Sequence, residues 1–220
     1  MRYADRLAEL DSCMLSDALD NLGLPGAVAG ITPIWQGARM AGRAVTMRTV
    51  PFDGRRSTRH LGAAALERAV DGEIIVVEQV RPEGAPPAAA TWGGLLARAA
   101  VHRGVGGVVV DGACRDVDEI RELRLPLSAR AVVPFTARGR FVEAAVGEPV
   151  TIGGVTVEEG DFVLADGSGV VFIPAERVDE VLAVADRLAA KEAVMAVALE
   201  EGAQPSEVLG RTYEEMLHDR

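Results

Sequence analysis

Two short stretches of this sequence combine residue types that could bind an anion and a metal ion. Gly93 and Gly94 open a predicted helix after a proline-rich loop, and the start of a helix carries unpaired N–H groups and a partial positive charge. Because glycine has no side chain, an anion can approach this backbone, so the amides of Gly94, Leu95 and Leu96 could hold a carboxylate or an oxyanion. The alternative is that the two glycines only allow a loop to pack tightly on the helix.

The second stretch is the pair Arg115-Asp116, which follows the apolar segment Gly107–Asp111 and a glycine turn. Open α/β sheets place their ligands at the carboxyl ends of parallel strands, where this pair is expected. Arginine binds a carboxylate through two donors, and an aspartate oxygen suits Mg²⁺ or Mn²⁺. The alternative is structural: Asp116 and Glu119 have the spacing of a helix-capping pair, with Arg115 solvated.

Alternating strands and helices in the middle of the chain predict a parallel sheet covered by helices, an α/β fold. After Glu148 the pattern changes, and three short strands joined by glycine-rich turns predict an antiparallel layer. The predicted strands of the first part are Ala44–Val50, Glu73–Val80, Gly107–Asp111 and Arg130–Phe135, and the predicted helices are Leu61–Val70, Gly93–Arg103 and Asp116–Leu123.

Helices are also predicted at both ends of the chain. Residues 4–22 have helical spacing of leucines with a break near Asp11-Ser12, Pro174–Glu201 reads as one long amphipathic helix, and a last helix is predicted for Pro205–His218. We find no internal repeat or linker, so a single domain over residues 1–220 is expected.

Charge and composition exclude several classes of function. The formal net charge of −10 disfavours a protein that follows nucleic-acid phosphates, which would need a basic face. Lys191 is the single lysine among 23 basic residues, so a Schiff-base mechanism would depend on it alone. Its charged surroundings favour a solvated, protonated ammonium, which argues against that mechanism.

The two cysteines, Cys13 and Cys114, lack the spacing of a zinc site and are expected to be reduced in a cytoplasmic protein. The N-terminal residues lack the apolar run of a signal peptide, and no apolar stretch is long enough to predict a transmembrane helix.

The sequence resembles the family of 4-hydroxy-4-methyl-2-oxoglutarate aldolases and RraA-like proteins (regulator of ribonuclease activity A). The most specific part is a glycine or carboxylate, twenty residues, and then Arg-Asp, which Gly94 and Arg115-Asp116 match. The similar segments are LSDALDNLGLPG at 15–26, MAGRAVTMRTV at 40–50, WGGLLARAAVHRGVGGVVVDGACRD at 92–116 and GDFVLADGSGVVFIP at 160–174.

The resemblance implies a swivelling β/β/α domain that forms a homotrimer or a dimer of trimers, and a metal-dependent lyase that releases pyruvate from 2-oxo acids. It implies that the backbone at Gly93, Gly94, Leu95 and Leu96 and the side chain of Arg115 bind the substrate. Two further assignments concern acidic residues: Asp116 ligates Mg²⁺ or Mn²⁺, and Glu192 of a neighbouring subunit helps to hold the metal's waters. His60, in a polar loop, is a weaker candidate by the same resemblance, and the segments 52–60 and 81–91 are expected to line the distal part of the pocket.

This sequence departs from the characterised aldolases, which often carry a carboxylate where it has Gly94. The resemblance therefore favours decarboxylation of oxaloacetate over aldol cleavage of 4-hydroxy-4-methyl-2-oxoglutarate. The alternative is a non-catalytic regulator that binds a ribonuclease, although that branch tends to lose the aspartate kept here as Asp116. A methyltransferase, another label used in this family, is disfavoured because no glycine-rich cofactor loop follows a first strand.

Overall fold

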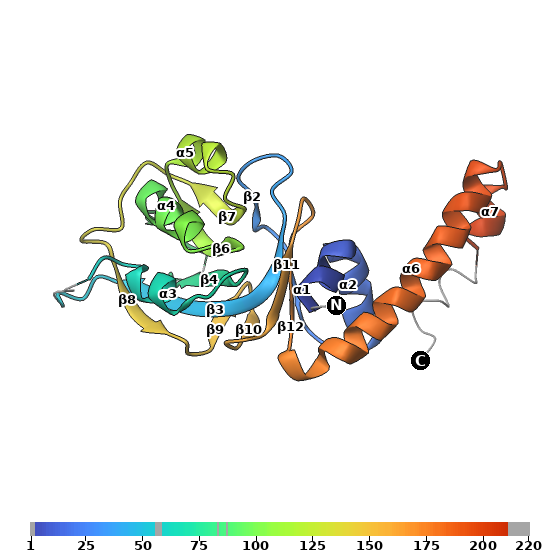
Figure 1. The fold of residues 1–220 in the computed structure, drawn as a ribbon, viewed down its shortest axis with the longest axis horizontal. Helices are drawn as coiled ribbons and strands as arrows, with labels where there is room; N and C mark the ends of the chain where they lie inside the picture. Colours follow the sequence, from blue (N-terminus) through green and yellow to red (C-terminus); the bar gives the residue numbers. More distant parts are fainter. Residues whose placement is uncertain (1–2, 56–58, 83, 87, 211–220) are drawn as a thin grey trace.

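The computed structural model describes residues 3–55, 59–82, 84–86 and 88–210. Its elements are drawn in Figure 1, where the colours follow the chain from blue to red. In chain order they are α1 (Tyr3–Glu9), α2 (Ser12–Asn21), β1 (Ala27–Val28), β2 (Thr32–Pro33), β3 (Met40–Pro51), α3 (Ala63–Arg68), β4 (Ile74–Gln79), β5 (Ala90–Trp92), α4 (Gly94–His102), β6 (Gly107–Cys114), α5 (Val117–Glu122), β7 (Leu127–Val132), β8 (Phe141–Val146), β9 (Val150–Ile152), β10 (Val155–Val157), β11 (Phe162–Ala165), β12 (Val170–Ile173), the 3₁₀ turn η1 (Ala175–Arg177), α6 (Val178–Glu200) and α7 (Pro205–Val208).

The long strand β3 joins the two halves of the main sheet. Its first residues pair antiparallel with β11, Ala44–Thr49 pair parallel with β4, and its last residues pair antiparallel with β8. The strand order is β1-β12-β11-β3-β4-β6-β7-β2, with β5 also paired to β6. Strands β3, β4, β6 and β7 are parallel neighbours, so their carboxyl ends lie at one edge, where an α/β sheet places its ligands.

The core follows from the alternation of side chains along these strands. Val108 and Val110 of β6 pack with α3, α4 and α5 on one face, whereas Val109 faces the β9–β10 hairpin on the other. Because β6 is buried on both faces, it is apolar without a break through Val110. A separate cluster packs α1, α2 and α6 against β11 and β12, on the far side of β3 from α4 and α5 (Figure 1).

The predicted fold class, an α/β protein with a central sheet covered by helices, is confirmed, as is the parallel pairing of its middle strands. The break in the N-terminal helix falls between α1 and α2, where Asp11 caps α2 by accepting a hydrogen bond from the amide of Met14. The long C-terminal helix is present as η1 and α6, and it extends well beyond the body of the molecule in Figure 1.

Four strand predictions were wrong in detail. The segment after Glu148 forms four strands instead of three, and the strand expected at Arg130–Phe135 is β7, three residues earlier. Strands β5 and β8 were missed, because β5 has three residues after a proline-rich loop and both depend on pairing with strands distant in sequence. Of the predicted last helix, Pro205–Val208 forms α7, and residues 211–218 lie outside the described residues. Among the helices that the structure describes, none is both long and apolar enough to span a membrane.

Candidate active site

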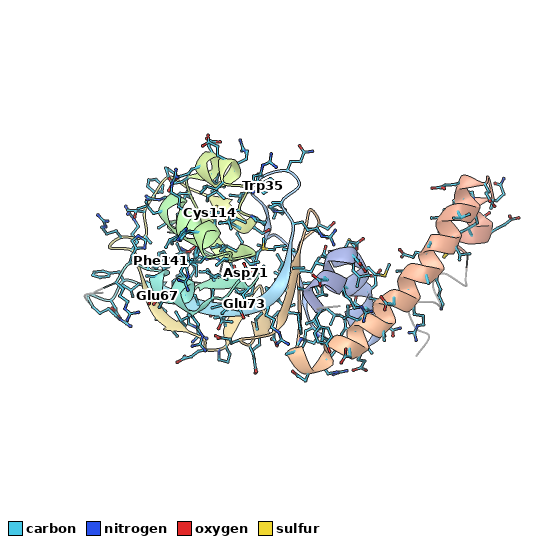
Figure 2. All side chains as sticks on the ribbon, viewed as in Figure 1. Trp35, Glu67, Asp71, Glu73, Cys114 and Phe141 are labelled. Atoms are coloured by element: carbon cyan, nitrogen blue, oxygen red, sulfur yellow. The ribbon has the colours of Figure 1, made fainter. Side chains whose placement is uncertain are left out.

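A pocket of about 760 Å³ lies at the carboxyl ends of β5 and β6. The start of α4 and the Arg115-Asp116 pair form one part of its wall, and the loops after β3 and before β8 contribute another. Figure 2 labels Cys114, which precedes Arg115, and Phe141, which lines the pocket from β8. Both residues lie in the lobe that contains α3, α4 and α5. The predicted site residues that line the pocket are His60, Gly93, Gly94, Leu95, Leu96, Arg115 and Asp116.

Asp116 connects the two predicted stretches. Its Oδ2 atom accepts a hydrogen bond of 2.9 Å from the amide of Gly94 and lies 3.4 Å from Nε of Arg115. The backbone of Asp116 is left-handed, with φ 58° and ψ 39°, and its side chain does not cap α5. The structure therefore does not support the capping alternative. A non-glycine residue in this region is uncommon and has a conformational cost, and this backbone turns the carboxylate toward α4.

The paired glycines leave room for charged side chains of the site. A Cβ atom on Gly93 would lie 2.8 Å from Oδ2 of Asp116, and one on Gly94 would lie 2.0 Å from Oε2 of Glu119. Gly93 has an extended backbone and Gly94 a helical one, and both conformations are open to any residue. The preference for glycine at these positions therefore comes from the limited space around them and not from backbone strain. The alternative, that the glycines serve only loop packing, does not account for these contacts with polar side chains.

Glu119 occupies the space that a side chain at position 94 would fill. It lies in the first turn of α5, and its carboxylate forms an ion pair with Arg98 of α4. Consequently, a carboxylate lies beside position 94 although the residue there is glycine. The sequence signal for this carboxylate is the spacing of three residues between Asp116 and Glu119, which sequence analysis interprets as a possible helix-capping pair.

The prediction that three amides at the start of α4 are available to an anion needs correction. The Gly94 amide is already bound to Asp116. The amides of Leu95 and Leu96 pair with no backbone acceptor among the residues that the structure describes, as expected for the first turn of a helix. The start of α4 can therefore offer a ligand the amides of Leu95 and Leu96, while the Gly94 amide holds the Asp116 carboxylate in place.

Hydrogen bonds between neighbouring strands fix the position of Arg115-Asp116. The amide of Arg115 donates to the carbonyl of Trp92 over 3.0 Å, which joins the ends of β5 and β6. The buried side chain of Gln79 donates to Ala89 over 2.7 Å and accepts from the amide of Ala113 over 3.1 Å, at an irregularity in β6. The two strand ends that carry the site are thus fixed to each other and to β4.

The wall of the pocket also contains polar groups that the described protein leaves unpaired. Thr91 and Trp92 line the pocket and are almost completely buried. Their polar atoms, Oγ1 of Thr91 and Nε1 of Trp92, find no hydrogen-bond partner among the described residues. Both atoms are buried from solvent, so the pocket does not present them to a ligand in this conformation.

The remaining candidate residues from the sequence are Glu192, Lys191 and His60. Glu192 lies on α6 near Asp11 and Asp17; its pKa is raised, chiefly by burial and further by these two carboxylates. The single chain does not bring Glu192 to the pocket, and its assignment to a neighbouring subunit's site stays a prediction. Lys191 lies beside it on α6 and does not line the pocket. His60 lines the pocket and places Nδ1 2.6 Å from the carbonyl of Leu61.

The donor set fits a hard divalent cation that keeps several water ligands. Oδ2 of Asp116 accepts a hydrogen bond from the Gly94 amide, and the Glu119 carboxylate fills the space where a side chain at position 94 would lie. Oδ1 of Asp116 receives no hydrogen bond from any described residue. Within the described residues, no cluster of three His, Cys, Asp or Glu side chains could hold a metal ion. Mg²⁺ is commonly held by one or two carboxylates plus water and substrate oxygens, so the arrangement is consistent with the predicted metal ligand.

Sequence analysis missed several residues that line the pocket, and it missed Glu119, which lies beside Gly94 without lining the pocket. Arg138, from the loop before β8, and Glu143, on β8, line the wall supplied by β3 and β8. Glu143 accepts a hydrogen bond of 2.9 Å from the amide of Gly62. The expectation that residues 52–60 line the pocket agrees with the described part of that segment, whereas only the end of 81–91 does so. No local pattern marked Arg138 or Glu143, because β8 reaches the site by pairing with β3.

Comparison with known proteins places this architecture in a family. A model of the RraA-like family, described as aldolase/RraA, matches residues 12–172. DlpA of Legionella pneumophila is 31% identical over 177 residues, which are 80% of this chain, but the chain spans only 28% of DlpA's length. A 4-hydroxy-4-methyl-2-oxoglutarate aldolase of Thermus thermophilus is 36% identical over 137 residues, covering 62% of this chain and 77% of that protein.

A solved structure agrees with the sequence matches. RraAS2 of Streptomyces coelicolor, described as an unusual member of the RNase ES inhibitor RraA protein family, superposes with a TM-score of 0.75 and 28% identity. The superposition covers 87% of this chain and 94% of RraAS2. Since the family model covers well over half of the sequence and the solved fold agrees with it, the chain belongs to the RraA-like family.

Proposed function

We propose that this protein is a divalent-metal-dependent carbon–carbon lyase that cleaves 2-oxo acids and releases pyruvate. One observation carries the proposal: a single pocket contains the Asp116 carboxylate, the Arg115 guanidinium and the start of α4. The name of the Thermus thermophilus relative, an aldolase for 4-hydroxy-4-methyl-2-oxoglutarate, supports this class of reaction.

Arg115 and the start of α4 bind the carboxylate end of the substrate. The guanidinium of Arg115 is partly exposed in the pocket and can donate two hydrogen bonds to a carboxylate. The amides of Leu95 and Leu96 are the donors left at the start of the helix. Holding both carboxylate oxygens orients the 2-oxo group and the neighbouring C3–C4 bond toward Asp116.

Asp116 would hold the cation, Mg²⁺ or Mn²⁺, with Glu119 beside it. When bound there, the cation would supply Lewis-acid stabilisation of negative charge on the 2-oxo oxygen. Asp116 is suited to this task because the Gly94 amide and Arg115 both contact Oδ2, which fixes the carboxylate and leaves Oδ1 directed elsewhere. Such outer contacts keep a ligand in one orientation.

The reaction breaks the C3–C4 bond and leaves its electron pair on C3 as the enolate of pyruvate. With oxaloacetate the other product is CO₂, and no base is needed in that step. With 4-hydroxy-4-methyl-2-oxoglutarate the C4 hydroxyl must lose a proton, so that C4 becomes the carbonyl of a second pyruvate. Within the chain, Glu119 is the carboxylate beside position 94 that could accept this proton through a water molecule. Protonation of C3 then completes the release of pyruvate.

The test combines one substitution with removal of metal. Asp116→Asn keeps the shape of the side chain and removes its charge, so pyruvate release from either substrate should fall at least about 100-fold, as expected for loss of a metal ligand. Asp118→Asn is the matched control, because Asp118 is two residues further along the chain, in α5, with its side chain 87% exposed. A lactate dehydrogenase-coupled assay measures both variants. Wild-type activity that survives excess EDTA would contradict metal dependence.

Two further experiments separate this proposal from its alternatives. Borohydride added with substrate should not inactivate the enzyme, because Lys191 is outside the pocket; inactivation would indicate a Schiff base. The relation to RraAS2 makes a ribonuclease-binding regulator the second candidate. Capture of a ribonuclease of that type, equal for the wild type and Asp116→Asn, together with no lyase activity in the wild type, would favour that candidate.

A further inference from the structure

Strand β6 changes its partner just before it reaches the site. Up to Asp111 it pairs with β4, and from Ala113 onward it pairs with β5. On its other side, Asp111 and Gly112 together stand opposite the single residue Arg130 of β7, so the strand contains a β-bulge. A bulge bends its strand and redirects the residues that follow it, which here are Arg115-Asp116. The conformation of the bulge therefore affects where the candidate site residues lie.

The side chain of Gln79, the last residue of β4, bridges this change of partner. Its Nε2 atom donates a hydrogen bond of 2.7 Å to the carbonyl of Ala89, which precedes β5, and its Oε1 atom accepts one of 3.1 Å from the amide of Ala113. A peptide group in the middle of a sheet makes the same two bonds, one as donor and one as acceptor. The amide of Gln79 thus takes the place of a peptide group between β5 and β6 at the point where β4 ends.

Burial makes these two hydrogen bonds costly to lose. The exposed fraction of Gln79 is 2%, and that of Ala89 and Ala113 is 0%. Without the side-chain amide, the Ala89 carbonyl and the Ala113 N–H would lose these bonds away from solvent, and the strands would have to shift to restore them. Because β5 leads into Gly93 and β6 leads into Arg115, a shift of either strand would move the site.

Gly112 provides a second, independent observation that the bulge is built around Gln79. A Cβ atom on Gly112 would lie 2.3 Å from Oε1 and 2.6 Å from Cβ of Gln79, so glycine leaves the room that this side chain occupies. The other residue of the bulge, Asp111, accepts a hydrogen bond of 3.1 Å from Arg81. The start of the bulge is therefore held by an ion pair, and its end, at Ala113, by the amide of Gln79.

Resting on the proposed function, we propose that Gln79 is a positioning residue, whose amide holds the β6 bulge in the conformation that places Arg115 and Asp116 beside the start of α4. Gln79 does not line the pocket itself. Two contacts carry its effect to the site: the Arg115 amide donates to the carbonyl of Trp92, and the Gly94 amide donates to the carboxylate of Asp116. Both contacts require the ends of β5 and β6 to keep their present separation.

The experiment measures the binding of Mn²⁺, followed through the paramagnetic resonance signal of the free ion. Gln79→Met keeps the approximate size of the side chain and removes both hydrogen-bonding groups. Its dissociation constant for Mn²⁺ should be at least about tenfold higher than that of the wild type, as expected when the groups that orient a metal ligand are disturbed.

Thr49→Val is the matched control. Thr49 is also buried, lies opposite Gln79 in β3, and donates from its hydroxyl to the carbonyl of Glu78 over 3.1 Å, without a bond to β6. Its dissociation constant for Mn²⁺ should stay within about twofold of the wild-type value, since each pair of hydrogen bonds described above remains intact.

Stability and metal affinity together separate a positioning role from a purely structural one. Both variants lose buried hydrogen bonds, so both should have a lower melting temperature than the wild type. Partial unfolding reduces the number of binding sites and leaves the dissociation constant of the folded molecules unchanged, whereas a displaced Asp116 raises that constant. If Gln79→Met does not fold, Gln79→Asn replaces it with the same expected result, because its amide is one methylene shorter and cannot reach both partners.

Hydrogen exchange at the amide of Arg115 tests the same role without metal. This amide bonds to Trp92 and not to Gln79, so its exchange reports the position of the strand end. It should exchange roughly fivefold faster in Gln79→Met, as expected for the weakening of one hydrogen bond, and at the wild-type rate in Thr49→Val.

The outcomes distinguish this inference from the proposed function. An unchanged Mn²⁺ dissociation constant in a folded Gln79 variant, or unchanged exchange at Arg115, would overturn the role of Gln79 and leave the proposed function intact. If the wild type binds no Mn²⁺, or if Asp116→Asn binds it equally well, the proposed function fails and the role of Gln79 fails with it.

Discussion

Replacing Gly94 with alanine should separate activity from stability, because the added methyl group would meet the carboxylate of Glu119. The new Cβ would lie 2.0 Å from Oε2 of Glu119, whereas ordinary contact begins at 3.4 Å, so the carboxylate must move by more than an ångström. It is the end of a flexible side chain and can do so by leaving its ion pair with Arg98. The substitution therefore moves a candidate catalytic carboxylate without removing it.

The expected change in stability is small. The Arg98–Glu119 pair is partly exposed, with side chains 61% and 31% accessible, and such pairs contribute about 0.2–1 kcal/mol. Alanine in a helix is favoured over glycine by up to about 1 kcal/mol, and Gly94 has no positive φ that would strain alanine. These effects oppose each other, so the melting temperature should stay within about 4 °C of the wild type.

The expected loss of activity is larger. Groups that orient metal ligands and their waters typically contribute 10-fold to 100-fold, so kcat/KM for 4-hydroxy-4-methyl-2-oxoglutarate should fall by roughly that factor in Gly94→Ala. Pyruvate release coupled to lactate dehydrogenase measures it. In a Glu119→Ala background the same methyl group meets no carboxylate, and adding Gly94→Ala should reduce activity less than twofold further.

The double variant tests whether the Glu119 carboxylate is what position 94 must accommodate. If the two losses multiply in the double variant, the glycine is required for a reason other than Glu119. Full activity of Gly94→Ala in the wild-type background would show that the position of the Glu119 carboxylate does not matter for the reaction.

Three further predictions concern two buried groups outside the pocket, Asp111 and Cys114. Asp111 is buried and accepts hydrogen bonds from the guanidinium groups of Arg81 and Arg130. Asp111→Ala should therefore destabilise the fold by about 3–5 kcal/mol and lower the melting temperature by roughly 10 °C. A shift of the melting temperature below about 2 °C would contradict this prediction. Burial raises the pKa of Cys114 to about 12, so its thiol stays protonated in the native state at pH 8, and iodoacetamide should label exposed Cys13 alone until the protein unfolds. Because the unfolded thiol ionises at a lower pH than the native one, Cys114 should also reduce stability progressively as pH rises from about 9 to 12, which equilibrium unfolding at several pH values would detect.

Much of the middle of the fold could be predicted because its signals are local. The unbroken apolar run of β6 and the alternation of strands with helices specify parallel strands buried on both faces. The position of Arg115-Asp116 at the end of β6 follows from the same pattern. By contrast, β5 and β8 are short or mixed in composition, and they form strands because β6 and β3 offer them partners.

Periodicity along the chain was enough to predict the α/β class and the end of β6 as the place of the site, because those signals involve residues close together in the chain. The pairing of the glycine-opened helix with Arg115-Asp116 was implied by the family resemblance, because the two segments are separated by some twenty residues. Packing between distant segments sets three other features: the carboxylate beside Gly94, the amide at the helix start that is already bound, and the place of Arg138 in the pocket lining. These contacts join α4 to α5, and they join the 133–140 loop to β3. They depend on the order of the strands in the sheet, which no local sequence pattern specifies.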